Sequence, residues 1–192
     1  MTILDKIIAF KKKEITKIKA DVPLKKLVES PLFQRTPISL KKSLLEVNSS
    51  GIIAEFKRQS PSKGVINDKA TIEDVTNGYL DANVAAQSIL TDTSFFGGTM
   101  VDLMKARTIN TTKPILRKDF IVDGFQIVEA KAIGADVILL IAACLTKEEL
   151  KHYIKKIKEH EANKTSTNKR NKYWKEYFTP TRTETSFNMN NF

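Results

Sequence analysis

The sequence predicts an α/β protein built from parallel βα units. Four short runs rich in Ile, Leu and Val are apolar on both faces, as buried parallel strands are: residues 51–56, 86–91, 114–117 and 137–142. After each run, a Thr or Asp stands three residues before an acid or amide, which is a helix-start signature. These four capping residues are Thr71, Thr99, Asp123 and Thr146. No hairpin signal separates the units, which favours a parallel sheet.

Two helices are expected before the first strand. The first begins with a capping box at residues 2–5. Its apolar stripe is formed by Ile3, Ile7 and Phe10. The lysines that follow, residues 11–13, are expected on the solvated face of this helix. A second, shorter helix is expected over residues 40–47.

Composition limits the class of protein. With 192 residues, 41% of them hydrophobic, the chain is expected to form one main core. The single cysteine, Cys144, lies in an apolar run and is expected to be a small buried core residue of a strand rather than a nucleophile. The absence of a signal-like start and of an apolar stretch near 18 residues predicts a cytoplasmic protein with no membrane partner. His152 and His160 are too few and too isolated to predict a metal site.

The positive charge is concentrated near the end of the chain. Of the net charge of +10, +6 falls in residues 151–192, so the main body is only mildly basic and suits a small anionic substrate. From Ala162 onward Asn, Thr and Lys dominate, which is typical of irregular structure. We therefore divide the chain into a helical extension (1–50), a βα region (51–160) and a divergent tail (161–192).

Charged and aromatic side chains gather at the predicted strand ends. Alternation places Glu55 and Lys57 on the same face of the first strand, and Lys118 closes the third. In a barrel, alternate strands contribute to the same interior layer, so the two lysines should converge. Phe96 and Phe120 supply apolar walls at neighbouring strand ends. From these residues alone, a structural ion pair and a site for an anionic ligand both remain open.

Four long segments resemble the first half of indole-3-glycerol-phosphate synthase: IAEFKRQSPSKG, SILTDTSFFGG, PILRKDFIVDGFQIVEA and GADVILLIAACLT. The resemblance covers about residues 1–155. It implies the (β/α)8 TIM-barrel fold with a helical extension, of which about the first four βα units are visible here. It also implies a reaction of tryptophan biosynthesis without cofactor or metal. The phosphorylated substrate 1-(2-carboxyphenylamino)-1-deoxyribulose 5-phosphate becomes indole-3-glycerol phosphate, with loss of CO2 and water.

The resemblance also implies a role for each matching residue. Lys118 matches the general acid of ring closure. Lys57 matches a lysine that contacts anionic groups of the substrate and assists proton transfer, and Glu55 matches the carboxylate that orients it. Five further residues match positions that cover the substrate or hold its aromatic ring: Ser60, Pro61, Phe96, Phe120 and Leu139.

Beyond residue 155 the sequence departs from the family pattern. No strand-like run remains, and the family's later catalytic glutamate and glycine-rich phosphate site are not visible. This change predicts a truncated or frame-shifted gene, or an alternate terminus. A second hypothesis is therefore an inactive half-barrel that self-associates through its open strand edges. A third is nucleic-acid binding by the tail, where aromatic residues stand among lysines: Tyr173, Trp174, Tyr177 and Phe178. A random out-of-frame composition explains those residues at least as well, so a nucleic-acid partner is not favoured.

Overall fold

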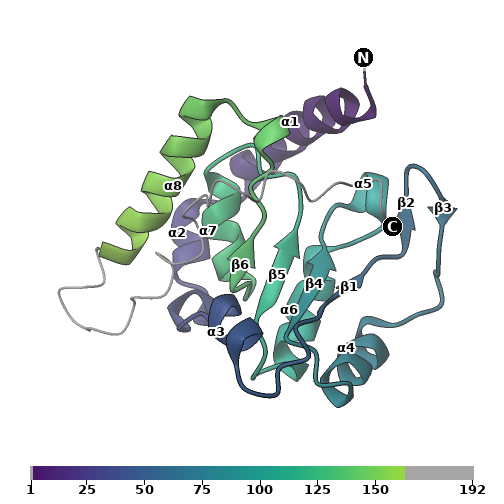
Figure 1. Ribbon diagram of the computed structural model, residues 1–192. Helices are drawn as coiled ribbons and strands as arrows, with labels where there is room; N and C mark the ends of the chain where they lie inside the picture. Colours follow the sequence, from purple (N-terminus) through teal and green to yellow (C-terminus); the bar gives the residue numbers. More distant parts are fainter. Residues whose placement is uncertain (1, 163–192) are drawn as a thin grey trace.

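The computed structural model describes residues 2–162, which are arranged around a four-stranded parallel sheet (Figure 1). The strands, in their spatial order, are β1 (Ile53–Phe56), β4 (Ala86–Leu90), β5 (Ile115–Lys118) and β6 (Val137–Ile138). Each neighbouring pair is parallel. Spatial order follows chain order, as expected for successive βα units, so the predicted α/β architecture is confirmed.

A helix follows each strand of this sheet, and the helices pack along one side of it (Figure 1). They are α4 (Ile72–Asp81), α6 (Met100–Ile109), α7 (Phe125–Ala132) and α8 (Lys147–Ala162). Three of the predicted capping residues accept the backbone N–H three positions on: Thr71, Thr99 and Thr146. At α7, Asp123 instead accepts the N–H of Phe125 at 2.7 Å, one residue nearer than predicted.

The core lies between the sheet and these helices. It is built mainly from aliphatic residues of both layers, among them Ile89, Leu103, Ile115, Ile121, Ile127 and Ile138. On β4, Gln87 points toward the helices, since its side-chain amide donates to the carbonyl of Thr76 in α4. Its neighbour Ser88 therefore points to the opposite face of the sheet, where the candidate site lies.

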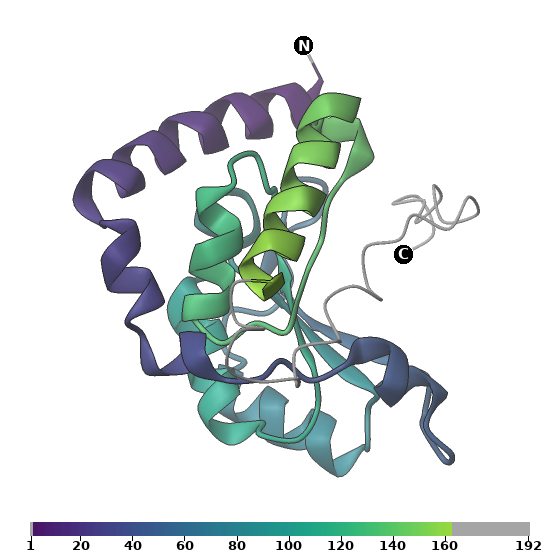
Figure 2. The same cartoon turned by 90° about the vertical axis from the view of Figure 1, so that its left-hand side faces the viewer.

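The helical extension wraps both ends of the sheet. Its elements are α1 (Ile3–Asp21), α2 (Leu24–Val28), the 3-10 helix η1 (Pro31–Gln34) and α3 (Leu40–Leu45). Helix α1 runs across the end at which the strands finish, and α2 turns down beside α7 (Figure 2). Helix α3 lies at the opposite end, where Ser43 donates to the carbonyl of Ala85 at 2.6 Å. The sequence predicted α1 and α3 but not α2 or η1, which are too short for a periodic signal.

The fourth strand is shorter than predicted. Residues 137–142 were expected to form it, but only Val137–Ile138 do, and Ala142–Cys144 form the 3-10 helix η2. β6 pairs only with Leu116 and Arg117 of β5, and no described strand lies on its other side, so the ladder stops early. Cys144 is consequently half-buried in η2 rather than buried in a strand, and this burial raises the pKa of its thiol.

A small hairpin was not expected from the sequence. β2 (Gln59–Ser60) pairs with β3 (Gly64–Val65) in antiparallel register. The turn between them is closed by Gly64, whose positive φ of 65° suits glycine, and by Ser60, which accepts the N–H of Lys63. Two-residue strands carry too little alternation to be recognised in a sequence.

The lysine run of α1 does not lie wholly on the solvated face. Lys12 and Lys13 are exposed as predicted, but Lys11 is buried and continues the stripe between Ile7 and Ile15. Phe10, assigned to that stripe, is 42% exposed. The buried face of α1 therefore runs through Ile7, Lys11 and Ile15 rather than through Phe10. Lys11 can be buried there because three ion pairs compensate its charge.

Two further observations apply to residues 2–162 alone. None of their helices is long and apolar enough to cross a bilayer. They hold no cluster of three or more His, Cys, Asp or Glu side chains that could bind a metal. Residues 161 and 162, which we assigned to the irregular tail, end helix α8. The rest of that prediction, and the prediction of nucleic-acid stacking by Tyr173, Trp174, Tyr177 and Phe178, lie outside the described residues.

Candidate active site

Glu55 lies between two lysines at the end of the sheet. Lys118 Nζ donates to Glu55 Oε2 at 2.7 Å, and Lys57 Nζ lies 3.2 Å from Oε1. All three side chains are about one-third exposed. The group is therefore neither a sealed structural pair nor a fully solvated one, and a small ligand can reach it.

The sheet geometry explains how residues 63 positions apart meet. β4 separates β1 from β5, with Glu55 opposite Ser88 and Lys118 opposite Leu90. Because side chains alternate along each strand, Glu55, Ser88 and Lys118 all point to the face away from the helices. Ser88 Oγ lies 3.5 Å from Glu55 Oε2, a long contact. The convergence of Lys57 and Lys118 expected from alternate strands is thus present, with Glu55 between them.

The charge state of Glu55 follows from its neighbours. Burial by itself would raise the pKa of the carboxyl group. The hydrogen bond and charge of Lys118, together with those of Lys57, outweigh burial and lower the pKa below its ordinary value of 4.5. Glu55 is therefore a carboxylate at neutral pH. It can accept hydrogen bonds from both lysines and hold them toward a common point.

Aromatic side chains lie at the adjacent strand ends. Phe96, in the one-turn helix α5 (Thr93–Phe96) after β4, and Phe120, just after β5, have ring centroids 6.0 Å apart and planes inclined by 37°. Phe120 is buried and Phe96 is half-buried. Leu139 follows β6 at the same end of the sheet and is half-buried. These residues can form an apolar wall beside the charged group.

Ser60 and Pro61 lie in the β2–β3 hairpin that follows Lys57. Ser60 is half-buried and its hydroxyl holds the hairpin turn, while Pro61 is exposed. The structure does not bring them onto Glu55 or Lys118. Their hairpin packs instead against α5, where a Cβ on Gly97 would lie 3.1 Å from the Gln59 side chain.

Sequence reasoning missed the side chain that fastens this hairpin. Arg58 makes a two-point contact with Asp102 of α6 at 2.7 and 2.9 Å, and its Nη1 donates to the carbonyl of Gly97 at 3.2 Å. Its guanidinium also lies 4.6 Å from the centre of the Phe56 ring. The available signal was alternation, which places Arg58 on the opposite face from Lys57.

A parallel βα array with its charged side chains at the strand ends is the arrangement of (β/α)8-barrel enzymes. The family model for indole-3-glycerol phosphate synthase matches residues 4–163. The chain therefore belongs to the indole-3-glycerol phosphate synthase family, whose members are TIM barrels, and its four-stranded sheet corresponds to part of that barrel.

Similar proteins bear the same name. The chain is 46% identical over 147 residues to indole-3-glycerol phosphate synthase of Bacteroides thetaiotaomicron, covering 77% of this chain and 56% of that protein. It is 40% identical over 158 residues to the synthase of Carboxydothermus hydrogenoformans, and the match covers 79% of this chain and 60% of that protein. It is 44% identical over 145 residues to indole-3-glycerol phosphate synthase of Burkholderia cenocepacia, and the match covers 74% of this chain and 55% of that protein. The chain thus spans little more than half the length of these relatives.

Proposed function

We propose that the described residues form the amino-terminal part of the active site of an indole-3-glycerol phosphate synthase. The reaction converts 1-(2-carboxyphenylamino)-1-deoxyribulose 5-phosphate into indole-3-glycerol phosphate, CO2 and water. The observation that carries the proposal is the group of Glu55, Lys57 and Lys118, held together at the ends of β1 and β5. The paired rings of Phe96 and Phe120 follow the neighbouring strand ends.

Ring closure needs a proton at the carbonyl oxygen. The aromatic carbon that bears the carboxylate attacks the ketone carbon of the sugar chain, and the ketone oxygen becomes a hydroxyl. In the proposed mechanism Lys118 supplies this proton, because its Nζ stands at the strand end and Glu55 holds its orientation at 2.7 Å. A carboxylate that fixes the acid before the substrate arrives reduces the cost of reaching the transition state.

Two losses complete the reaction. The C–C bond to the substrate carboxylate breaks, its electrons restore the ring, and CO2 leaves. The new hydroxyl then leaves as water with a proton from an acid, and a base removes the ring proton. Lys57, 3.2 Å from Glu55, is the residue we place near the substrate carboxylate and in the proton transfers of this stage. We assign Phe96, Phe120 and Leu139 to the wall that holds the aromatic ring.

The hairpin is the proposed cover of the site. Ser60 and Pro61 lie three and four residues after Lys57, and Arg58 fastens their segment to α6. A segment that starts at a catalytic residue can enclose the substrate and exclude water from the charged group.

We propose that the 192-residue chain on its own reaches no more than trace turnover. Residues 2–162 contribute four strand ends, and the partner carboxylate and phosphate-binding segment implied by the family resemblance match no part of the sequence. A longer protein containing this chain would be a separate case. The second hypothesis, an inactive half-barrel that self-associates, can be tested on the same purified chain.

The experiment is a turnover assay on the purified chain that follows indole-ring formation by fluorescence. Support would be a trace rate that disappears in Lys118→Ala and persists in the surface variant Lys12→Ala. A rate equal in wild type and Lys118→Ala would overturn the assignment of the acid. A rate comparable to that of a full-length relative would overturn the proposal that the site is incomplete.

A further inference from the structure

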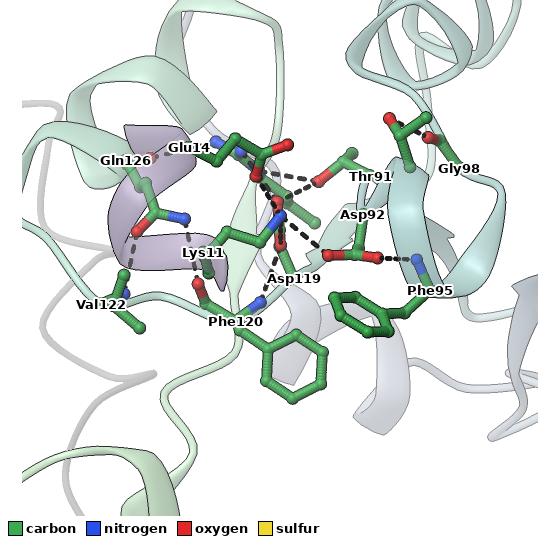
Figure 3. Close-up of polar contacts among 12 residues, drawn as sticks. Lys11, Glu14, Thr91, Asp92, Phe95, Gly98, Asp119, Phe120, Val122 and Gln126 are labelled. Atoms are coloured by element: carbon green, nitrogen blue, oxygen red, sulfur yellow. Dashed lines mark hydrogen bonds and ion pairs between the residues drawn. The ribbon is translucent and has the colours of Figure 1, made fainter. Parts of the chain in front are cut away.

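Helix α1 inserts a buried lysine among the strand ends. Lys11 is 2% exposed, and its Nζ is surrounded by three carboxylates (Figure 3). It lies 2.6 Å from Glu14 Oε2, 2.8 Å from Asp92 Oδ2 and 3.2 Å from Asp119 Oδ1. Burial would lower the pKa of Lys11, but the charge of Asp119 and the hydrogen bonds to Asp92 and Glu14 outweigh it and raise the pKa. Lys11 is therefore a cation at neutral pH.

The two buried carboxylates also hold the turns that carry the aromatic wall. Asp92, the first residue after Thr91 at the end of β4, caps α5 by accepting the N–H of Phe95 at 2.8 Å through its other oxygen, Oδ1. Helix α5 ends with Phe96. Asp119, the residue after Lys118, accepts the N–H of Phe120 at 2.8 Å through Oδ1. Asp92 therefore connects Lys11 to the short helix that ends in Phe96, and Asp119 connects Lys11 to the backbone of Phe120.

Asp119 has other partners, whereas Asp92 depends on Lys11. Asp119 Oδ2 accepts from Thr91 at 2.7 Å and from Arg117 at 3.0 Å. Burial would raise the pKa of Asp119, but the charges of Arg117 and Lys11 outweigh it and lower the pKa, so the group is a carboxylate. Within residues 2–162, Lys11 is the one cation in contact with Asp92, whose side chain is completely buried. Without Lys11, two like charges would face each other with one of them unpaired.

A second contact joins α1 to α5. Phe10, next to Lys11, meets Phe95 edge to face with ring centroids 5.6 Å apart. Two consecutive residues of α1 thus hold the short helix that ends in Phe96. A four-residue helix has little stability of its own, so its position depends on such contacts.

We propose that Lys11 is a positioning residue that fixes Phe96 relative to Phe120, and with them the wall for the aromatic part of the substrate. Its Nζ is enclosed by carboxylates, so it acts through Asp92 and Asp119 rather than on the ligand. The identity of that ligand rests on the proposed function. The coupling of Lys11 to the two rings does not.

Lys11→Met tests the proposal, because methionine keeps most of the length of lysine and removes the charge. Ile15→Ala is the matched control, since Ile15 lies one turn further along α1 and packs on Val122 and Phe125. Fluorine NMR of 4-fluorophenylalanine at position 96 and the backbone amide signals of Phe95 and Phe120 report the wall without ligand. Titration with indole-3-glycerol phosphate then reports binding.

Lys11→Met is expected to shift the fluorine signal and both amide signals and to weaken binding about tenfold or more. Ile15→Ala is expected to lower the melting temperature while leaving the fluorine signal and the affinity of the folded protein unchanged. Lys11→Arg should restore part of the affinity, because a guanidinium can contact both carboxylates. A folded Lys11→Met protein with unshifted signals would overturn the proposal.

Two outcomes keep this test separate from that of the proposed function. If the wild-type chain does not bind the phosphate ester, the proposed function fails, and the ligand-free signals still decide on Lys11. If Lys11→Met does not fold, Asp92→Asn replaces it, because asparagine keeps the helix cap and removes the ion pair. The fluorine signal at position 96 should then shift while the Phe120 amide does not, and an unshifted fluorine signal would count against the proposal.

Discussion

Lys118 Nζ and Glu55 Oε2 lie 2.7 Å apart although β4 stands between their strands. The pair spans the middle of the sheet and fixes the ammonium group of Lys118 at the strand ends. Since Glu55 also lies 3.2 Å from Lys57, one carboxylate holds both lysine side chains.

The two lysines should differ in their effect on catalysis. In any form of the protein that turns over substrate, Lys118→Ala should lower kcat by about 10²–10⁴-fold, the range for loss of a general acid. Lys57→Ala should cost less and raise KM more, because we assign Lys57 mainly to binding and orientation. Steady-state kinetics by indole fluorescence measures both. A fully active Lys118→Ala enzyme would remove Lys118 from the mechanism.

Glu55 should make stability depend on pH in the acid range. Its folded-state pKa lies below the ordinary 4.5, so its contribution is fully present above about pH 4.5 and is lost as pH falls through the folded pKa. The free energy of unfolding of wild type should exceed that of Glu55→Gln at pH 7, and the difference should shrink below pH 4.5. Urea unfolding of both proteins between pH 3 and 7 measures this. A difference that grows on acidification would contradict the assigned ion pairs.

Lys11 should contribute to stability over a different pH range. Lys11→Met leaves the buried carboxylate of Asp92 without its cation, a change that typically costs about 3–5 kcal/mol. Because the folded-state pKa of Lys11 is raised above 10.5, its contribution is complete below that pH and is lost only as pH rises through the folded pKa. Urea unfolding should give the same penalty at pH 6.5 and pH 9. A penalty that vanishes by pH 9 would show that Lys11 is not held as a cation.

The 192-residue chain should self-associate or aggregate when it is prepared alone. β1 is an edge strand of the described sheet, and two aliphatic residues at its start are exposed, Ile52 and Ile53. β6 is the other edge strand of the described sheet, and its side chains Val137 and Ile138 are buried. The β1 edge is therefore the surface we expect to pair.

Analytical ultracentrifugation at low concentration checks this prediction. Ile52→Lys should lower the association, whereas Val101→Lys, at an equally exposed position on α6, should leave it unchanged. A wild-type chain that sediments as a compact monomer and melts cooperatively would contradict the prediction.

Local signals in the sequence were sufficient for much of the fold and for part of the site. Thr71, Thr99 and Thr146 could be identified as caps because a cap needs only a hydroxyl and a nearby acid. The convergence of Lys57 and Lys118 followed from strand alternation and strand order, whereas the contact of Glu55 with Lys118 was not predicted. Each of these depends on short-range or regular geometry.

The features that the sequence did not predict depend on tertiary contacts. A run of three lysines normally faces solvent, and only the folded positions of Asp92 and Asp119, far along the chain, make Lys11 a buried cation. Residues 139–142 have strand composition but lack a pairing partner in the described sheet. The turn hydrogen bonds and glycine geometry of the β2–β3 hairpin emerge only in three dimensions.

The most direct test of the central claim is an NMR titration of the isotope-labelled chain with indole-3-glycerol phosphate. The account predicts saturable shifts at the Lys57 and Lys118 side chains and at Phe120, weakened strongly in Lys118→Ala and unchanged in Lys12→Ala. Absence of saturable shifts up to millimolar ligand, or shifts confined to residues away from β1, β4 and β5, would contradict it.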